Sequence, residues 1–135
     1  MLNRIDNIAY IAVIGDIKSS KNSENRQSVQ LKLKKILDSI NDEFRVYLAS
    51  KFMITLGDEF QGLLKNGTKA VYIIDKIERE MYPVKIRFGL GAGKITTDIN
   101  FEMPFGADGP AYYNAREMIE KIRISEKKKM ESKSN

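Results

Sequence analysis

Residues 52–64 read FMITLGDEFQGLL, and two short apolar runs in this stretch flank the turn Gly57-Asp58-Glu59. Apolar runs joined by a short turn that contains glycine are typical of a β-hairpin. The chain has 135 residues, a length that suits one domain. We therefore expect two antiparallel strands at the centre of a single folded unit, with the other elements packed around them.

Five further elements are predicted on either side of the hairpin. Residues 8–14 form a continuous apolar run of the kind found in a buried strand, and residues 24–44 carry apolar side chains at helical spacing. After the hairpin, a second helical pattern ends before Pro83, and residues 84–91 alternate as in a half-buried strand. A third helix is predicted to begin at Pro110, because proline suits the first helical position.

This β-α-β-β-α-β-α order predicts an α+β fold with helices on one face of an antiparallel sheet. Right-handed crossovers that each leave room for one strand give the spatial order 4-1-3-2, a ferredoxin-like βαββαβ arrangement with a C-terminal helix added. The first strand then ends at Asp16 beside the turn that holds Asp58, so we expect these acids to lie close together. Three glycines of the late strand are expected to permit close packing on the second face of the sheet, namely Gly89, Gly91 and Gly93.

The composition excludes several classes of function. The chain has no His and no Cys, so it cannot contain a Ser-His-Asp triad, a cysteine nucleophile or a conventional zinc site. No apolar run approaches the ~20 residues of a membrane span, and the N-terminal residues lack the pattern of a signal peptide. We therefore expect a cytoplasmic protein without a membrane partner.

Most of the net charge of +5 lies at the C-terminus. Residues 121–135 hold six basic and two acidic side chains, whereas the rest of the chain is nearly neutral. Residues 125–135 contain one apolar side chain, Met130, and such a polar segment is expected to be disordered. We therefore place the domain in residues 1–124 and a basic tail or linker in residues 125–135, with a nucleic-acid-binding arm as the alternative.

Asp16 and Asp58 at one sheet edge would raise each other's pKa unless a positive group joined them. A divalent cation such as Mg²⁺ or Mn²⁺ is a natural partner, because Mg²⁺ takes hard oxygen ligands and completes its shell with water and substrate phosphates. Phosphoryl transfer assisted by such ions needs neither His nor Cys. Glu59 is either a third ligand or a solvent-facing turn residue. The alternative for the two aspartates is that Asp16 caps a loop and Asp58 fills a turn.

The loop after the first strand offers groups that suit a phosphate. Backbone N–H groups, hydroxyls and ammonium groups all bind phosphate oxygens. The candidate phosphate ligands in this loop are Lys18, Ser19, Ser20 and Lys21.

Several motifs resemble those of nucleotide cyclases. The stretch ITLGDEFQGLL at residues 54–64 resembles the GGDEF hairpin of diguanylate cyclases. IGDI at residues 14–17 resembles the metal-binding end of the first strand in those enzymes and in class III nucleotide cyclases, and residues 86–91 and 111–116 resemble their late strand and following helix. As a whole, the chain to about Arg123 resembles the SatD family, whose members are bacterial or archaeal and have no established biochemical activity.

The cyclase resemblance implies that Asp16 and Asp58 are metal-binding catalytic residues, that the Ile17 carbonyl assists them, and that Asn114 and Arg116 face a phosphate. It further implies binding of a nucleoside triphosphate with Mg²⁺ or Mn²⁺, and nucleotidyl or phosphoryl transfer. A homodimer is also implied, since class III cyclases build their active sites across a dimer. Longer SatD proteins carry a C-terminal region that resembles a helix-turn-helix, so DNA binding is expected only through a region that this sequence lacks.

Two departures from the cyclase pattern leave the activity open. Leu56 stands in place of the first glycine of GGDEF, and Tyr112 stands at the position of the cyclase asparagine. Three hypotheses follow from the sequence. The first is a domain that binds a metal and a nucleotide, with or without turnover. The second is a non-catalytic regulatory or dimerisation domain of a DNA-binding regulator, and the third is a scaffold with a vestigial site.

Overall fold

The computed structural model describes residues 9–18, 25–103 and 107–134. Its strands and α-helices follow the predicted order, and a 3₁₀ turn precedes the second strand. The elements are β1 (Tyr10–Ile17), α2 (Arg26–Glu43), η2 (Arg45–Tyr47), β2 (Leu48–Ile54), β3 (Glu59–Leu64), α3 (Ala70–Met81), β4 (Ile86–Gly93) and α4 (Pro110–Ser134).

The four strands form one sheet in the order β2-β3-β1-β4, which reads 4-1-3-2 from the opposite edge. All neighbouring strands are antiparallel. β1 is therefore an inner strand, with the hairpin on one side and β4 on the other. This is the α+β architecture expected from the sequence, and it places the end of β1 next to elements from three other parts of the chain.

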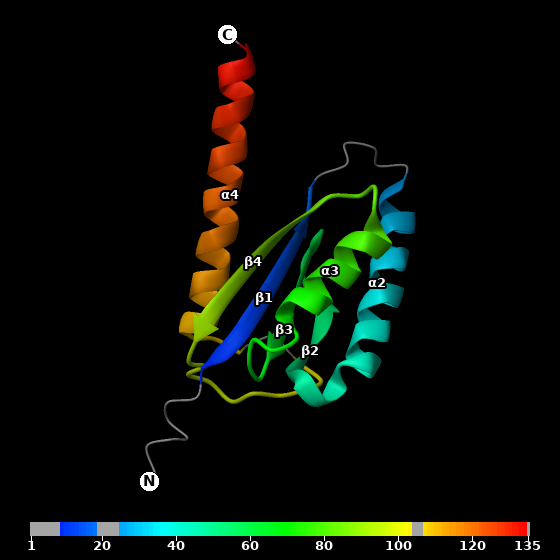
Figure 1. The fold of residues 1–135 in the computed structure, drawn as a ribbon, viewed down its shortest axis with the longest axis vertical. Coiled ribbons are helices and arrows are strands. Elements are labelled where there is room, and N and C mark those ends of the chain that lie inside the picture. Colours follow the sequence, from blue (N-terminus) through cyan, green and yellow to red (C-terminus); the bar gives the residue numbers. More distant parts are fainter. Residues whose placement is uncertain (1–8, 19–24, 104–106, 135) are drawn as a thin grey trace.

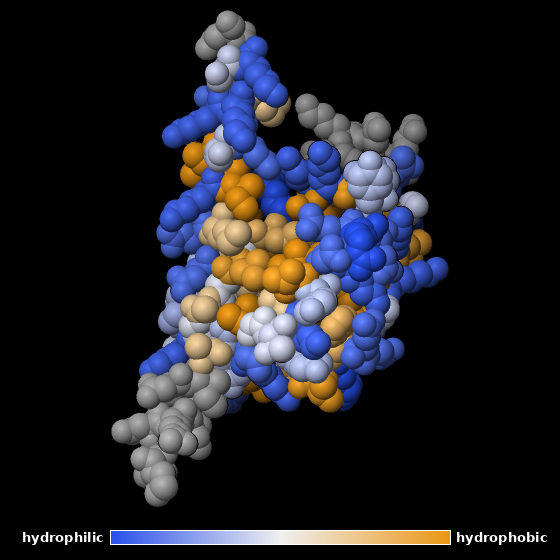
Figure 2. All heavy atoms as spheres, viewed as in Figure 1, coloured by the Kyte–Doolittle hydropathy of each residue, from blue (hydrophilic) through white to orange (hydrophobic). Residues whose placement is uncertain are grey.

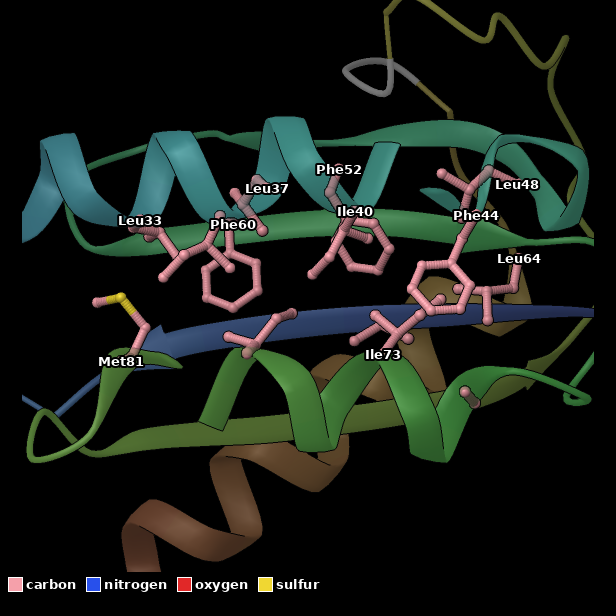
Figure 3. Packing of buried hydrophobic residues seen from close by; sticks show 14 of the residues in the cluster. Leu33, Leu37, Ile40, Phe44, Leu48, Phe52, Phe60, Leu64, Ile73 and Met81 are labelled. Carbon is pink, nitrogen blue, oxygen red and sulfur yellow. The ribbon is translucent and has the colours of Figure 1, made fainter. Parts of the chain in front are cut away.

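α2 and α3 cover one face of the sheet and enclose the larger core (Figure 1). In the close-up, Leu33 and Leu37 of α2 approach Phe60 of β3, and Ile73 of α3 closes the core from the other side (Figure 3). All four side chains are at most 2% exposed. The helical spacing of apolar residues in α2 and α3 therefore corresponds to the faces that these helices bury.

α4 lies on the opposite face of the sheet, so the expectation that the helices share one face is wrong for the third helix (Figure 1). The glycines of β4 explain this position. A Cβ atom at Gly89 would lie 2.1 Å from the Ala115 carbonyl oxygen, and one at Gly91 would lie 2.0 Å from the Ala111 carbonyl oxygen. Because no side chain fits there, the backbone of α4 packs directly on β4, and the close packing expected for these glycines is confirmed.

α4 continues to Ser134, so the expected disorder of residues 125–135 is wrong as far as Ser134, and the expected boundary after residue 124 falls inside a helix. Lys, Glu and Met favour helices, and a helix already formed on the sheet extends without a new nucleation cost. The polar composition indicates exposure, but exposure does not end a helix, and the last turns project beyond the sheet (Figure 1). Although α4 has 25 residues, neither it nor another helix in the described ranges is apolar enough to cross a bilayer.

Candidate functional site

The end of β1 meets the β2–β3 turn, as predicted. The Ile17 N–H donates a hydrogen bond to the Asp58 carbonyl oxygen over 3.0 Å. Gly57 shapes the turn with a φ of +61°, a left-handed conformation that glycine adopts without steric cost. The backbone therefore brings Asp16 and Asp58 to the same edge of the sheet.

Gly15 faces the core beneath α2 and α3, whereas its neighbour Asp16 faces the other side of the sheet. A Cβ atom at Gly15 would lie 2.0 Å from the ring of Phe60, which belongs to the core beneath α2 and α3. Because side chains alternate along a strand, Asp16 shares its face with Ile14, which packs in the cluster beneath α4. Asp16 therefore points to the side of the sheet that α4 covers.

Asp16 is the centre of a network of ion pairs. Its Oδ2 atom accepts hydrogen bonds from Arg123 Nη2 at 2.6 Å, from Arg123 Nε at 3.1 Å and from Arg87 Nη1 at 3.2 Å. Arg87 is the neighbour of Asp16 on β4, whereas Arg123 comes from α4. Only 11% of the Asp16 side chain is exposed. The hydrogen bond to Asp16 raises the pKa of Arg123, so the guanidinium remains charged beside this carboxylate.

Glu126 extends the network along α4. Its carboxylate accepts a hydrogen bond from Arg87 Nε at 2.7 Å and lies 2.9 Å from Lys18 Nζ. The hydrogen bond from Lys18, assisted by the one from Arg87, lowers the pKa of Glu126 against the opposing effect of desolvation. Arg123 Nη1 also donates to Glu120 Oε1 over 2.6 Å. Three bases and three acids are thus connected, which leaves the network without net charge.

The acids of the turn have arginine partners of their own. Glu59 lies opposite Asp16 in the register of β1 and β3, and its two carboxylate oxygens accept hydrogen bonds from Arg116 at 3.3 and 3.4 Å. Asp58 pairs with Arg26 at the start of α2, with 3.5 Å between Oδ1 and Nε. Since α2 and α4 lie on opposite faces of the sheet, these two neighbouring acids are neutralised from different faces.

The ligand chemistry of this edge fits a hard divalent cation, although arginines hold the acids in this conformation. The carboxylates of Asp16, Asp58 and Glu59 and the Ile17 carbonyl are the kind of oxygen ligands that Mg²⁺ prefers. Among the residues that the structure describes, no three acids are grouped closely enough to hold a metal. Two unit charges of like sign 4 Å apart near a protein surface repel by about 4 kcal/mol. Binding of a cation at Asp16 therefore requires its arginine partners to move.

The three predicted phosphate ligands that the structure describes all have partners within the protein. Lys18 belongs to the Asp16 network, and Arg116 lies beside Glu59. Asn114 donates a hydrogen bond from Nδ2 to the Ala92 carbonyl oxygen over 2.9 Å, so its amide joins α4 to β4. The remaining predicted ligands lie outside the described residues, namely Ser19, Ser20 and Lys21.

Sequence reasoning missed Arg87, Arg123 and Glu126 as partners at this edge. Arg87 stands between two apolar residues of a strand, a pattern that indicates a side chain on the opposite face from the core. Arg123 follows Arg116 by seven residues, so both lie on the same side of α4. Both Arg123 and Glu126 lie in the charged residues 121–135, whose composition does not indicate that the helix continues.

An open groove runs between α3, β4 and α4, and apolar residues gather along this side of the molecule (Figure 2). Its volume is about 850 Å³, within the range of small-molecule sites. Lys18, Arg87 and Glu126 line the groove, so it borders the Asp16 network. Its apolar lining consists of Ile74, Val84, Ile86, Phe88, Leu90 and Ile122.

The fold is similar to that of guanylyl cyclase catalytic domains. A double mutant of the cyclase domain of the RhoGC fusion protein from the fungus Blastocladiella emersonii gives a TM-score of 0.62 at 18% identity, covering 84% of this chain and 74% of that chain. The catalytic core of a rhodopsin-guanylyl cyclase with converted specificity, in complex with ATPαS, gives 0.60 at 18% identity, covering 84% and 72%. The cyclase domain of RhGC from Catenaria anguillulae, in complex with GTP, gives 0.52 at 21% identity, covering 82% and 71%. At these identities the likeness establishes the fold alone.

No curated protein matches the sequence. The SatD family, in contrast, matches residues 10–132. This range contains the whole sheet, the β2–β3 turn with its acids, and α4 almost to its end. The chain therefore belongs to the SatD family.

Proposed function

We propose that this SatD-family domain binds a nucleoside triphosphate through a divalent cation held at Asp16 and Asp58. The observation that carries the proposal is the hydrogen bond between the Ile17 N–H and the Asp58 carbonyl, which joins the two acidic segments at one sheet edge. Cyclase domains of similar fold have been solved with GTP and with ATPαS, which supports a nucleotide as the ligand.

The proposed cation ligands are the carboxylates of Asp16 and Asp58, assisted by the Ile17 carbonyl and by Glu59. When bound, Mg²⁺ or Mn²⁺ supplies the positive charge that joins carboxylates to phosphates and that supports nucleotidyl or phosphoryl transfer. Asp16 is the central ligand in this proposal because it lies on β1 and pairs with Arg87, which lines the groove.

The proposed phosphate contacts come from the basic side chains around this edge. Lys18 and Arg87 line the groove, and Arg116 is available once it leaves Glu59. The apolar walls of the groove suit the base of a nucleotide, while its charged end suits the phosphates. Ser19, Ser20 and Lys21 complete the proposed phosphate set, whereas Asn114 is left out because its amide is bonded to β4.

Isothermal titration calorimetry with ATP and GTP, each with and without Mn²⁺, tests this proposal. We expect binding that depends on the cation and that Asp16→Asn weakens by about tenfold or more, since an interaction with a charged group is worth about 1.5 kcal/mol or more. Asp38→Asn is the matched control, because it removes the same charge from an exposed position on α2. Absence of binding by the wild type, or equal binding by Asp16→Asn, would contradict the proposal.

The arginine pairs favour a second candidate, a non-catalytic regulatory or dimerisation domain of a DNA-binding regulator. With its acids paired, the sheet edge is already neutralised without a cation. Five lysines of α4 are exposed, namely Lys121, Lys127, Lys128, Lys129 and Lys133. In this case we expect the protein to bind DNA with an affinity that falls as salt is raised. A gel-shift titration without binding at low salt would remove this candidate, and sedimentation velocity would test the homodimer.

A further inference from the structure

Arg123 already holds the carboxylate oxygen that a cation at Asp16 would need. Its Nη2 and Nε atoms lie 2.6 and 3.1 Å from Asp16 Oδ2, both closer than Arg87 Nη1 at 3.2 Å. The contact is therefore a forked hydrogen bond from one guanidinium to one oxygen. Charge-assisted contacts of this kind are among the stronger hydrogen bonds in proteins. A positive group thus stands at the centre of the proposed cation site.

Arg123 can leave Asp16 without disturbing the packed core. Forty per cent of its side chain is exposed. Among the described residues, the apolar cluster beneath α4 ends at Ile119 along the helix. Arg123 also has Glu120 of its own helix as a second partner at 2.6 Å, so its charge stays paired after release. The Asp16–Arg123 contact is therefore a polar tie between β1 and residues 120–134 of α4.

We propose that Arg123 competes with a divalent cation for Asp16, so that cation binding and the tie between β1 and α4 exclude each other. This inference rests on the proposed function. In the tied state Arg123 neutralises Asp16. In the released state Asp16 accepts the cation once Arg87, which also bonds Glu126, has turned away from it. Because the cation binds the released state alone, its apparent affinity equals its intrinsic affinity multiplied by the fraction of molecules that are released.

The competition makes residues 120–134 of α4 a control element for the site. By thermodynamic reciprocity, a cation at Asp16 weakens the contact between Arg123 and Asp16 by the same free energy by which that contact weakens cation binding. A protein segment that held this part of α4 away from β1 would therefore raise the affinity of Asp16 for the cation.

Titration of the full chain with Mn²⁺ alone, followed by water proton relaxation, measures the competition. Arg123→Gln is expected to bind Mn²⁺ about tenfold more tightly than the wild type, the change expected if the wild type is tied about nine-tenths of the time. Lys121→Gln is the matched control, because it removes the same charge from the same helix, but its side chain is 74% exposed and pairs with Glu117. The Mn²⁺ affinity of the control should stay within about twofold of that of the wild type, since interactions between exposed charges are screened by salt. Adding Asp16→Asn to Arg123→Gln should abolish the gain.

Hydrogen exchange of α4 gives a second readout that does not depend on the affinity. Saturating Mn²⁺ should speed exchange in residues 120–134 of the wild type, because the tie to β1 is broken. The same addition should leave exchange in Arg123→Gln unchanged, because that variant lacks the contact with Asp16 that the cation breaks, while Glu126 keeps its pairs with Arg87 and Lys18 in both proteins. Circular dichroism of both variants checks that the helix content is retained.

The outcomes separate this inference from the proposed function. Equal Mn²⁺ affinities in the wild type and Arg123→Gln, with binding lost in Asp16→Asn, would overturn the competition and leave the cation site intact. No Mn²⁺ binding in the wild type or in Arg123→Gln would overturn both. Binding that survives Asp16→Asn unchanged would place the cation elsewhere and would also overturn both.

Discussion

Gly91→Ala should displace α4 from the sheet. An added Cβ atom would lie 2.0 Å from the Ala111 carbonyl oxygen and 2.4 Å from the Ala115 nitrogen. Both are backbone atoms of α4, so no side-chain rotation relieves the clash. Since ordinary contacts are about 3.5–4.0 Å long, the helix must move by more than about 1 Å.

The cost of this displacement has two parts. Overpacking costs about 1–3 kcal/mol when the neighbours adjust. A displaced α4 also gives up part of the burial of Tyr112 and Ile119, and full burial of a large apolar side chain is worth about 1.5–3 kcal/mol. We therefore expect Gly91→Ala to lower the free energy of unfolding by about 3 kcal/mol.

Urea denaturation followed by circular dichroism measures this loss, with Gly67→Ala as the matched control. The atom nearest to a Cβ at residue 67 is Ile11 Cγ1 at 3.9 Å, an ordinary contact. The control should therefore lie within about 1 kcal/mol of the wild type or be slightly more stable. If Gly91→Ala were as stable as Gly67→Ala, direct packing of the α4 backbone on β4 would be refuted.

Tyr112, Glu126 and Asn41 give three further tests. Burial raises the pKa of Tyr112 to about 12, above the ordinary value of 10.0, so its contribution to stability is present below pH 10 and is lost as the pH rises through 12. Absorbance titration of the wild type should show an ionisation near pH 12 that Tyr112→Phe lacks. Identical titration curves for the two proteins would contradict the raised pKa of Tyr112. The pKa of Glu126 is lowered from 4.5, so its contribution is present above that pH and is lost as the pH falls below it. Glu126→Gln should therefore narrow the difference in Tm between pH 7 and pH 3, and an equal difference would argue against the pairs with Lys18 and Arg87. Asn41 bonds both the N–H and the carbonyl of Phe52, at 2.7 and 2.9 Å, so Asn41→Ala should cost about 2 kcal/mol in urea denaturation, whereas a loss below about 0.5 kcal/mol would mean that water replaces the amide.

Most of the fold could be predicted because its signals are local. The spacing of apolar residues indicates the strands and helices, and short crossovers leave few ways to order the strands. The face of the sheet on which α4 packs was harder to predict, since it depends on the contact between Gly91 of β4 and the small residues Ala111 and Ala115. The helical end of α4 was missed because polar composition does not reveal that a preceding helix is already formed.

The candidate site was predictable at the backbone level and not at the level of its partners. The strand order brings Asp16 to the turn of Asp58, so their proximity follows from topology. The contact between Asp16 and Arg123 joins residues 107 positions apart, and it depends on how far α4 extends and on which side faces the sheet. No local pattern carries that information, and the two acids were therefore expected to need a cation when arginines already neutralise them.

The packing of α4 and the charges at Asp16 are linked, and this link separates two explanations of cation affinity. Arg116 and Arg123 lie seven residues apart on α4, about 10 Å along the helix, and they reach Glu59 and Asp16 on neighbouring strands. Displacement of the whole helix by Gly91→Ala should separate both acids from their partners on α4, whereas Arg123→Gln removes the α4 partner of Asp16 alone. If competition by the guanidinium controls the site, Mn²⁺ affinity should rise in both variants. A rise confined to Arg123→Gln would mean that the arginine stays on Asp16 when the helix moves, and that the side chain rather than the docking of α4 sets the affinity.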